Sequence, residues 1–162
     1  MGEDLKDVMP PLPTRRAVAE RGHVMTDTSY LLRPIGTVRS ALTDREEAPR
    51  QGYEGAPDAW LELDPAVVDG LDGIAVGDEI VLITWFHQSQ RDTLKVHPGR
   101  NRNLPLTGVF ATRSPNRPNP LGLHRVTVRE IDGTRLKVGP LEALDGTPVV
   151  DIKSVLSRSA DT

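Results

Sequence analysis

The sequence predicts an all-β fold, a small antiparallel β-barrel of about six or seven strands with long loops and little helix. The 162-residue chain contains 14 Gly and 14 Pro, which interrupt long helices, and only two residues each of Trp, Tyr and Phe to fill a core. Its apolar residues fall in short runs that alternate or are rich in β-branched side chains. Closure into a barrel leaves no strand edge exposed, and a β-sandwich is the alternative.

The chain divides by composition into an extension, one domain and a tail. Residues 1–29 include Pro10-Pro11-Leu12-Pro13 and lack sustained apolar periodicity, so we expect a disordered extension there. The barrel domain is expected over residues 30–156, followed by a tail at 157–162. Seven strands are predicted in the domain, at Leu31–Arg39, Ala59–Leu63, Glu79–Phe86, Gly108–Ala111, Leu123–Ile131, Arg135–Val138 and Val149–Ile152.

Two short sequence motifs predict a hairpin and a helix. Asp132-Gly133 separates two alternating runs, which predicts a β-hairpin with a type I′ turn, a turn that needs two residues tolerant of positive φ. Asp64-Pro65 precedes a short apolar stretch that ends near Gly70. Because Pro is favoured in the first turn of a helix, this stretch predicts one short helix.

Several classes of protein are excluded by what the sequence lacks. No run approaches the roughly 18 apolar residues of a membrane-spanning helix, and no charged head with an apolar segment resembles a signal peptide. The absence of Cys excludes disulfides and thiolate metal sites. The spacing of His87, His97 and His124 matches no compact metal-ligand pattern. We therefore expect a cytoplasmic protein with no membrane association and no bound metal.

A basic block lies within an otherwise acidic chain. The net charge is −3, yet Trp85–Arg129 contains a single acid, Asp92, against eight basic residues: Arg91, Lys95, Arg100, Arg102, Arg113, Arg117, Arg125 and Arg129. Such a block favours an anionic partner, such as the phosphates of a nucleotide or nucleic acid. The alternative is a solvated loop whose charges share no face.

The segment Gly108–Leu123 is the most unusual part of the chain. Pro115, Pro118 and Pro120 stiffen it, because each proline fixes φ. The segment therefore predicts a shaped ligand loop that presents Arg113 and Arg117, whose guanidinium groups can bind a carboxylate or phosphate through two hydrogen bonds. The alternative is a Pro-rich turn that Arg pins to backbone carbonyls.

Three sequence stretches resemble one known family. Phe86-His87-Gln88, the Gly108–Leu123 segment and Asp145–Lys153 together resemble the TsaA-like proteins, whose characterised type is tRNA methyltransferase O. The resemblance spans about residues 32–156, and Pro49-Arg50-Gln51-Gly52 also fits the family's early loop. It implies an S-adenosylmethionine-dependent methyltransferase on a small β-barrel, a homodimer with its cofactor near the subunit interface. The implied reaction is N6-methylation of threonylcarbamoyladenosine next to the tRNA anticodon.

The same resemblance implies a cofactor site. The expected contacts are Gln51, Gly52, Phe86, His87, Arg113, Leu123, Leu141 and Glu142. Three residues depart from the family pattern, His124, Ser154 and Val155, so a small-molecule methyl acceptor remains an alternative to tRNA. A non-catalytic module that binds S-adenosylmethionine or RNA is the alternative from another class. No G-x-G-x-x-G motif follows any predicted strand, so a Rossmann-type site has no support.

Methyl transfer to an amide-like N6 calls for a base or a charge-stabilising donor nearby, because that nitrogen is weakly nucleophilic until its proton leaves. His87, Asp145 and Asp151 are the catalytic candidates. Their structural alternatives are a histidine bonded to backbone, a turn aspartate and an ion-paired strand residue. Lys95, Arg100, Arg102 and Arg117 are the candidates for binding the phosphates of a tRNA substrate.

Overall fold

The computed structural model describes residues 29–156, and the compact unit that carries the fold begins at Leu32. The predictions of a disordered extension and of a C-terminal tail therefore fall outside the described residues, apart from Ser29. No helix within residues 29–156 is both long and apolar enough to cross a membrane.

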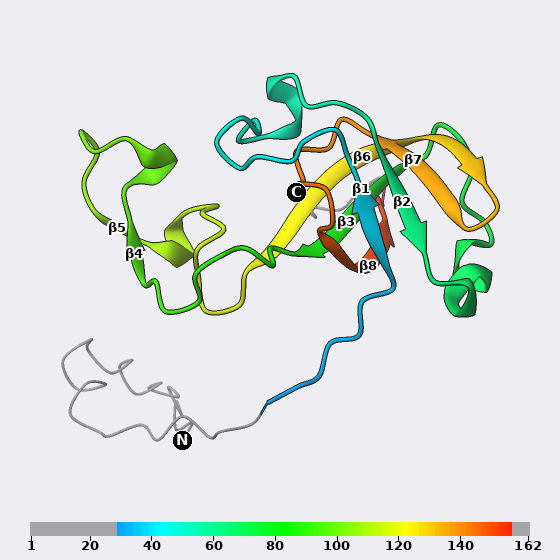
Figure 1. Ribbon diagram of the computed structural model, residues 1–162, viewed down its shortest axis with the longest axis horizontal. Coiled ribbons are helices and arrows are strands. Elements are labelled where there is room, and N and C mark those ends of the chain that lie inside the picture. The colour runs from blue at the N-terminus through cyan, green and yellow to red at the C-terminus, as the bar shows by residue number, and fades with distance from the viewer. Residues whose placement is uncertain (1–28, 157–162) are drawn as a thin grey trace, which may run out of the picture. The chain divides into compact units, whose positions relative to one another are not determined.

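Six antiparallel strands form a closed barrel in the order β1-β2-β7-β6-β3-β8, which confirms the predicted all-β barrel (Figure 1). The strands are β1 (Gly36–Arg39), β2 (Ala59–Leu63), β3 (Glu79–Trp85), β6 (Leu121–Asp132), β7 (Arg135–Gly139) and β8 (Pro148–Ser154). A separate two-stranded sheet pairs β4 (Lys95–Val96) with β5 (Thr107–Gly108). These two strands belong to residues 87–120, between β3 and β6, which we call the arm.

The barrel core follows from alternation along the strands. In β6, His124, Val126 and Val128 are buried, whereas Leu123 and Arg125, which alternate with the first two, are exposed. The same period of two buries the first, third and fifth residues of β2. The interior is therefore aliphatic, with Leu61, Leu82, Leu136 and Leu141 fully buried, as the scarcity of aromatic residues requires.

The predicted short helix is present as a 3-10 helix, η2 (Pro65–Leu71). The side chain of Asp64 caps it, because its Oδ1 accepts a hydrogen bond from the Ala66 amide at 2.8 Å. The other 3-10 segments among the described residues are single turns: η1 (Gly52–Glu54), η3 (Pro98–Arg100) and η4 (Val109–Ala111).

The predicted hairpin joins β6 to β7, but its loop is shifted by one residue. Asp132 pairs with Arg135, so the loop is Gly133-Thr134, and of these two only Gly133 has a positive φ, of 60°. A type I′ turn would need positive φ at both loop positions, whereas a glycine first in the loop suits type II′. The side chains of Asp132 and Arg135 form an ion pair across the hairpin end.

Two strand predictions are wrong in part. Gly108–Ala111 was expected as a strand, but only Gly108 belongs to β5, and the next three residues form η4, closed by a hydrogen bond from the Thr112 amide to the Val109 carbonyl at 3.1 Å. The first predicted strand begins at Gly36 rather than at Leu31. Leu31 is 85% exposed, so its apolar side chain does not pack into the core and gave a misleading strand signal.

Candidate functional site

A cleft of about 1060 Å³ opens where the end of β3 and the start of β6 meet the arm. Its other walls are the loop after β1 and the segment between β7 and β8. Backbone hydrogen bonds hold these walls in place, since the Phe86 amide donates to the Pro120 carbonyl at 2.8 Å and the Arg117 amide to the Gln90 carbonyl at 3.1 Å. The cleft is thus framed by chain segments that are far apart in sequence.

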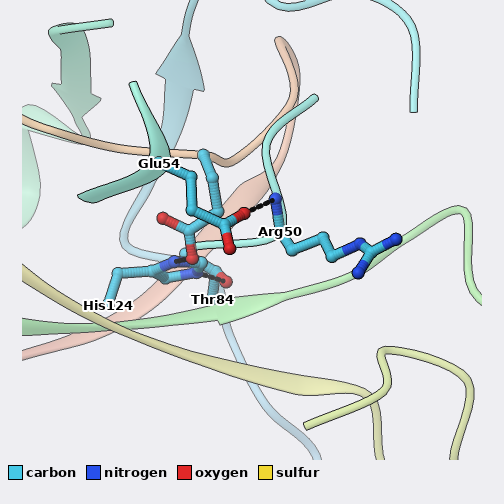
Figure 2. A network of polar contacts seen from close by, with 5 residues as sticks. Arg50, Glu54, Thr84 and His124 are labelled. Atoms are coloured by element: carbon cyan, nitrogen blue, oxygen red, sulfur yellow. Dashed lines mark hydrogen bonds and ion pairs between the residues drawn. The ribbon is translucent and has the colours of Figure 1, made fainter. Parts of the chain in front are cut away.

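A chain of polar side chains lies beneath the cleft (Figure 2). The His124 imidazole is buried in the barrel wall, with its side chain only 1% exposed, and its Nε2 lies 2.8 Å from the Thr84 hydroxyl. Its Nδ1 lies 2.7 Å from Oε1 of Glu142, which lines the cleft. The Phe86 ring meets the imidazole edge-on, with centroids 5.7 Å apart. His124 therefore fixes the orientation of the Glu142 carboxylate.

Glycine is required at two positions around this chain. A Cβ on Gly122 would lie 2.4 Å from Thr84 Oγ1 and 2.7 Å from His124 Nε2, so a larger residue would separate the hydrogen-bonded pair. A Cβ on Gly52 would lie 2.9 Å from the Pro140 carbonyl oxygen and 3.2 Å from Glu142 Oε2. Both glycines allow backbone to approach the Glu142 network closely.

In the Gly108–Leu123 segment, one arginine pins the backbone, as the structural alternative predicted, and the other is exposed in the cleft. The Arg117 guanidinium donates three hydrogen bonds to backbone carbonyls, of Ser114 at 2.7 Å, Val109 at 3.0 Å and Thr112 at 2.6 Å. It is therefore a brace for the loop. Arg113 is exposed, lines the cleft and makes no hydrogen bond to another described residue.

Most of the predicted site residues line this one cleft. They are Gln51, Phe86, His87, Arg113, Leu123 and Glu142 of the expected cofactor site, together with Lys95, Arg100, Arg102 and Arg117 of the expected phosphate-binding set. The His87 side chain is exposed and has no hydrogen-bond partner within residues 29–156, unlike the backbone-bonded histidine of the structural alternative. These sequence predictions thus converge on a single place in the fold.

Four predicted residues lie elsewhere. Gly52 sits behind Glu142, and Leu141 is a fully buried core residue. Asp145 is a turn residue whose Oδ1 accepts from the Ser40 amide at 3.1 Å. Asp151 forms an ion pair with Lys153 at 3.0 Å and lines a different cavity, beside Glu79 and Arg125. Of the three catalytic candidates, only His87 faces the cleft.

The sequence did not single out several residues that the cleft brings together. Arg45 and Arg50 come from the loop after β1, outside the basic block, and the sequence indicated Arg50 only as part of the family-like loop, with no role in a site. Asn116 ties that loop to the arm by accepting from Arg45 Nη2 at 3.1 Å. Thr84 emerged only through its buried contact with His124, which the sequence marks as a departure from the family pattern and not as a site residue. Within the described residues, no three His, Asp or Glu side chains lie close enough to hold a metal ion.

The sequence model of the tRNA-methyltransferase O N-terminal domain matches residues 37–161, most of the chain. The chain belongs to this family. The confirmed resemblance covers the barrel, the arm and every residue that lines the cleft.

Relatives in the tRNA-methyltransferase O N-terminal domain family include two archaeal proteins. One from Methanothermobacter thermautotrophicus, named "Probable S-adenosyl-L-methionine-binding protein", is 40% identical over 80% of this chain and 92% of its own length. One from Archaeoglobus fulgidus, named "S-adenosyl-L-methionine-binding protein", is 42% identical over 76% of this chain and 87% of its own.

A solved structure has the same fold. The crystal structure of TrmO from Pseudomonas aeruginosa is similar to 83% of this chain, with a TM-score of 0.64 and 33% sequence identity. The matched region is 61% of that protein, so this chain spans less than two thirds of its solved relative.

Proposed function

We propose that this chain is an S-adenosylmethionine-dependent methyltransferase whose acceptor is N6 of threonylcarbamoyladenosine next to the tRNA anticodon. One observation carries the proposal: a single cleft combines an apolar floor that bears the Glu142 carboxylate with walls of cationic side chains. The floor suits a methyl donor and the walls suit a polyanion. Family membership supports a methyltransferase, and the names of the archaeal relatives support the cofactor.

The residues of the floor fit S-adenosylmethionine by their chemistry. Phe86 and Leu123 offer apolar surface for an adenine ring. Oε1 of Glu142 is taken by His124, whereas Oε2 has no hydrogen-bond donor among the described residues and is available to a ribose hydroxyl or an ammonium group. Arg113 can bind a carboxylate through two hydrogen bonds. When bound, this cofactor supplies an electrophilic methyl group.

The chain's own part in the reaction is to align the acceptor and to take up a proton. Displacement at a methyl carbon is in line, so rigid placement of the acceptor lowers the barrier by alignment. The proline-stiffened loop, braced by Arg117, provides a rigid wall for this purpose. We assign His87 as the base that accepts the proton of the acceptor nitrogen. Of the three catalytic candidates it alone lines the cleft, and its imidazole has no hydrogen-bond partner within the described residues.

The direct test measures transfer of labelled methyl from S-adenosylmethionine to tRNA that carries or lacks the threonylcarbamoyl group. We expect labelling of the modified tRNA only. Labelling of neither tRNA, with the cofactor still bound in calorimetric titration, would contradict a tRNA methyltransferase and favour a small-molecule acceptor or a binding module.

Arg113→Ala tests the cleft itself. An exposed loop arginine buries little surface, so the melting temperature should stay unchanged. Loss of charge-assisted hydrogen bonds to the cofactor should lower kcat/KM by about 10- to 100-fold. Arg125→Ala is the matched control, because Arg125 is paired with Glu79 at 2.8 Å and does not line the cleft. Equal activity of the two variants would remove Arg113 from the site.

A further inference from the structure

Positive charge is distributed in two distinct ways over the described residues. Among the barrel cations, five form an ion pair with an acid: Arg39, Arg125, Arg129, Arg135 and Lys153. Lys137 on β7 is the one described strand cation of the barrel without such a pair. None of the side-chain cations that line the cleft forms an ion pair with a described acid: Arg45, Arg50, Lys95, Arg100, Arg102, Arg113 and Arg117. Arg50 contacts an acid only through its backbone amide, which donates to Glu54 Oε2 at 3.0 Å (Figure 2). Only Glu46 and Glu142 supply acid to the same lining. The cleft therefore holds uncompensated positive charge.

Two of these cations repel one another. Arg45 is half-buried where its Nη2 donates to Asn116, and the pKa of its guanidinium is lowered by burial and then by the charge of Arg100. Bringing two like charges together without a counter-charge costs free energy. A bound anion would remove that cost.

The Arg50 side chain reaches the turn formed by Gly99 and Arg100. A Cβ on Gly99 would lie 3.0 Å from Arg50 Nη1, so the guanidinium rests against the backbone next to Arg100. Figure 2 shows this side chain pointing away from His124 and Thr84. The guanidinium therefore belongs to the wall of the cleft and not to its floor.

The turn that carries Arg100 is strained. Gly99 has φ 60° and Arg100 has φ 58°, and Arg100 is the one non-glycine residue with positive φ within residues 29–156. This conformation costs a residue with a Cβ about 1–2 kcal/mol. Strain of this kind collects at ligand clamps, where the surrounding structure holds it in place. This strained turn holds Arg100 next to Gly99, against which Arg50 rests, and within electrostatic reach of Arg45.

We propose that the guanidinium groups of Arg45, Arg50 and Arg100 form an anion site that binds a backbone phosphate of the polynucleotide substrate. This assignment rests on the proposed function, because the cofactor itself carries too little negative charge to match the cleft. Guanidinium groups from two loops can surround the oxygens of one phosphate. Arg50 directly precedes Gln51 on the cleft wall, so the site fixes a phosphate near the methyl-accepting nucleotide.

The test is Arg100→Asn, because Asn tolerates the left-handed conformation and carries no charge. Without ligand, the variant should melt at a higher temperature than the parent protein, since the repulsion of Arg45 is relieved. Its affinity for tRNA should fall, and the slope of log Kobs against log salt should shrink by about 0.7 to 0.9, the value for one lost phosphate contact. Arg125→Asn, which breaks a barrel ion pair, should leave that slope unchanged.

Two results would overturn the proposal. One is a lower melting temperature for Arg100→Asn together with an unchanged salt slope, which would make Arg100 a structural residue. The other result combines two observations on the parent protein: pyrophosphate raises its melting temperature, and the protein does not bind tRNA. In that result the rise in melting temperature is absent from Arg100→Asn. That result would assign the anion site to a small phosphorylated ligand. Because binding is measured apart from methyl transfer, retained tRNA binding without labelling would count against the proposed function alone.

Discussion

Gly122 shows how one residue without a side chain can set the floor of the cleft. It lies on β6 beside Thr84 of the neighbouring strand β3, in register with it. The space that a Cβ would take is occupied by the Thr84 hydroxyl, the His124 imidazole and the tip of the Phe86 ring. The hydrogen bonds that orient Glu142 therefore depend on the absence of one carbon atom.

Gly122→Ala should disturb this floor. The new methyl group would lie 2.5 Å from Phe86 Cζ as well as against the polar pair, and overpacking of this kind costs about 1–3 kcal/mol of unfolding free energy. We expect a lower midpoint in urea and weaker binding of S-adenosylmethionine by calorimetry. Gly108→Ala is the control, because φ there is −60° and no atom lies within 4 Å of its Cβ. A Gly122→Ala protein with the stability of that control would contradict the tight packing.

Single residues also mark how far sequence reasoning reached into the site. His87 and Arg113 could be predicted, because each lies in a distinctive local motif. Arg45 and Arg50 could not, because they join Arg100 only through the folding of the loop after β1 onto the arm. The partnership of His124 with Thr84 and Glu142 spans three separate elements, and no local pattern encodes it.

The shape of the loop between η4 and β6 depends on its prolines and also on hydrogen bonds from an arginine side chain. Three carbonyls that face inward across the loop are bound by the single Arg117 guanidinium. The loop is further joined to the rest of the arm, since Arg91 donates from Nε to the Pro118 carbonyl at 2.9 Å and stacks over Trp85. The loop is therefore fixed in shape by hydrogen bonds to its own backbone.

Arg117→Lys should loosen this loop without unfolding the barrel. Lysine keeps the positive charge but cannot reproduce the planar, multiply donating geometry of arginine, so carbonyls would lose their partners. We expect faster amide exchange at residues 109–117 and a raised KM for the acceptor, with a melting temperature close to that of the parent. Unchanged exchange in the loop would show that the prolines alone hold its shape.

Elements with a buried and an exposed face were the ones that sequence could predict. β2 has the predicted bounds, and β3 and β7 end within one residue of theirs. Alternation along the barrel wall marks β2, whereas β3 is marked by a continuous apolar, β-branched run that is buried at Ile80, Val81 and Leu82. The pair of β4 and β5 has only two residues in each strand and was missed. Alternation with a period of two cannot be recognised in a strand of two residues. The pairing of β4 with β5 is instead determined by the loops of the arm that bring them together.

At the scale of the whole molecule, the barrel is closed unevenly. β3 and β6 are paired through seven residue pairs, from Glu79 with Thr127 to Trp85 with Leu121. β1 and β8 meet through two, and one of these includes Pro148, which has no amide hydrogen to donate. The hydrogen bond from the Val38 amide to the Thr147 carbonyl, at 2.9 Å, extends this seam beyond the regular pairing. Closure thus depends on the shortest ladder of the barrel.

Native-state hydrogen exchange should reveal this difference. Local opening needs less free energy where few cross-strand bonds must break together, whereas central pairs exchange only through global unfolding. We expect the amides of Ile35 and Val38 at the seam to exchange at a lower free energy than those of β3, and to depend less on added urea. Both seam amides donate to carbonyls of the chain around Pro148, that of Ile35 to Val149 at 2.7 Å. Exchange of seam and β3 amides at one common free energy would mean that the barrel opens only as a unit, and that its shortest ladder is no weaker than its longest.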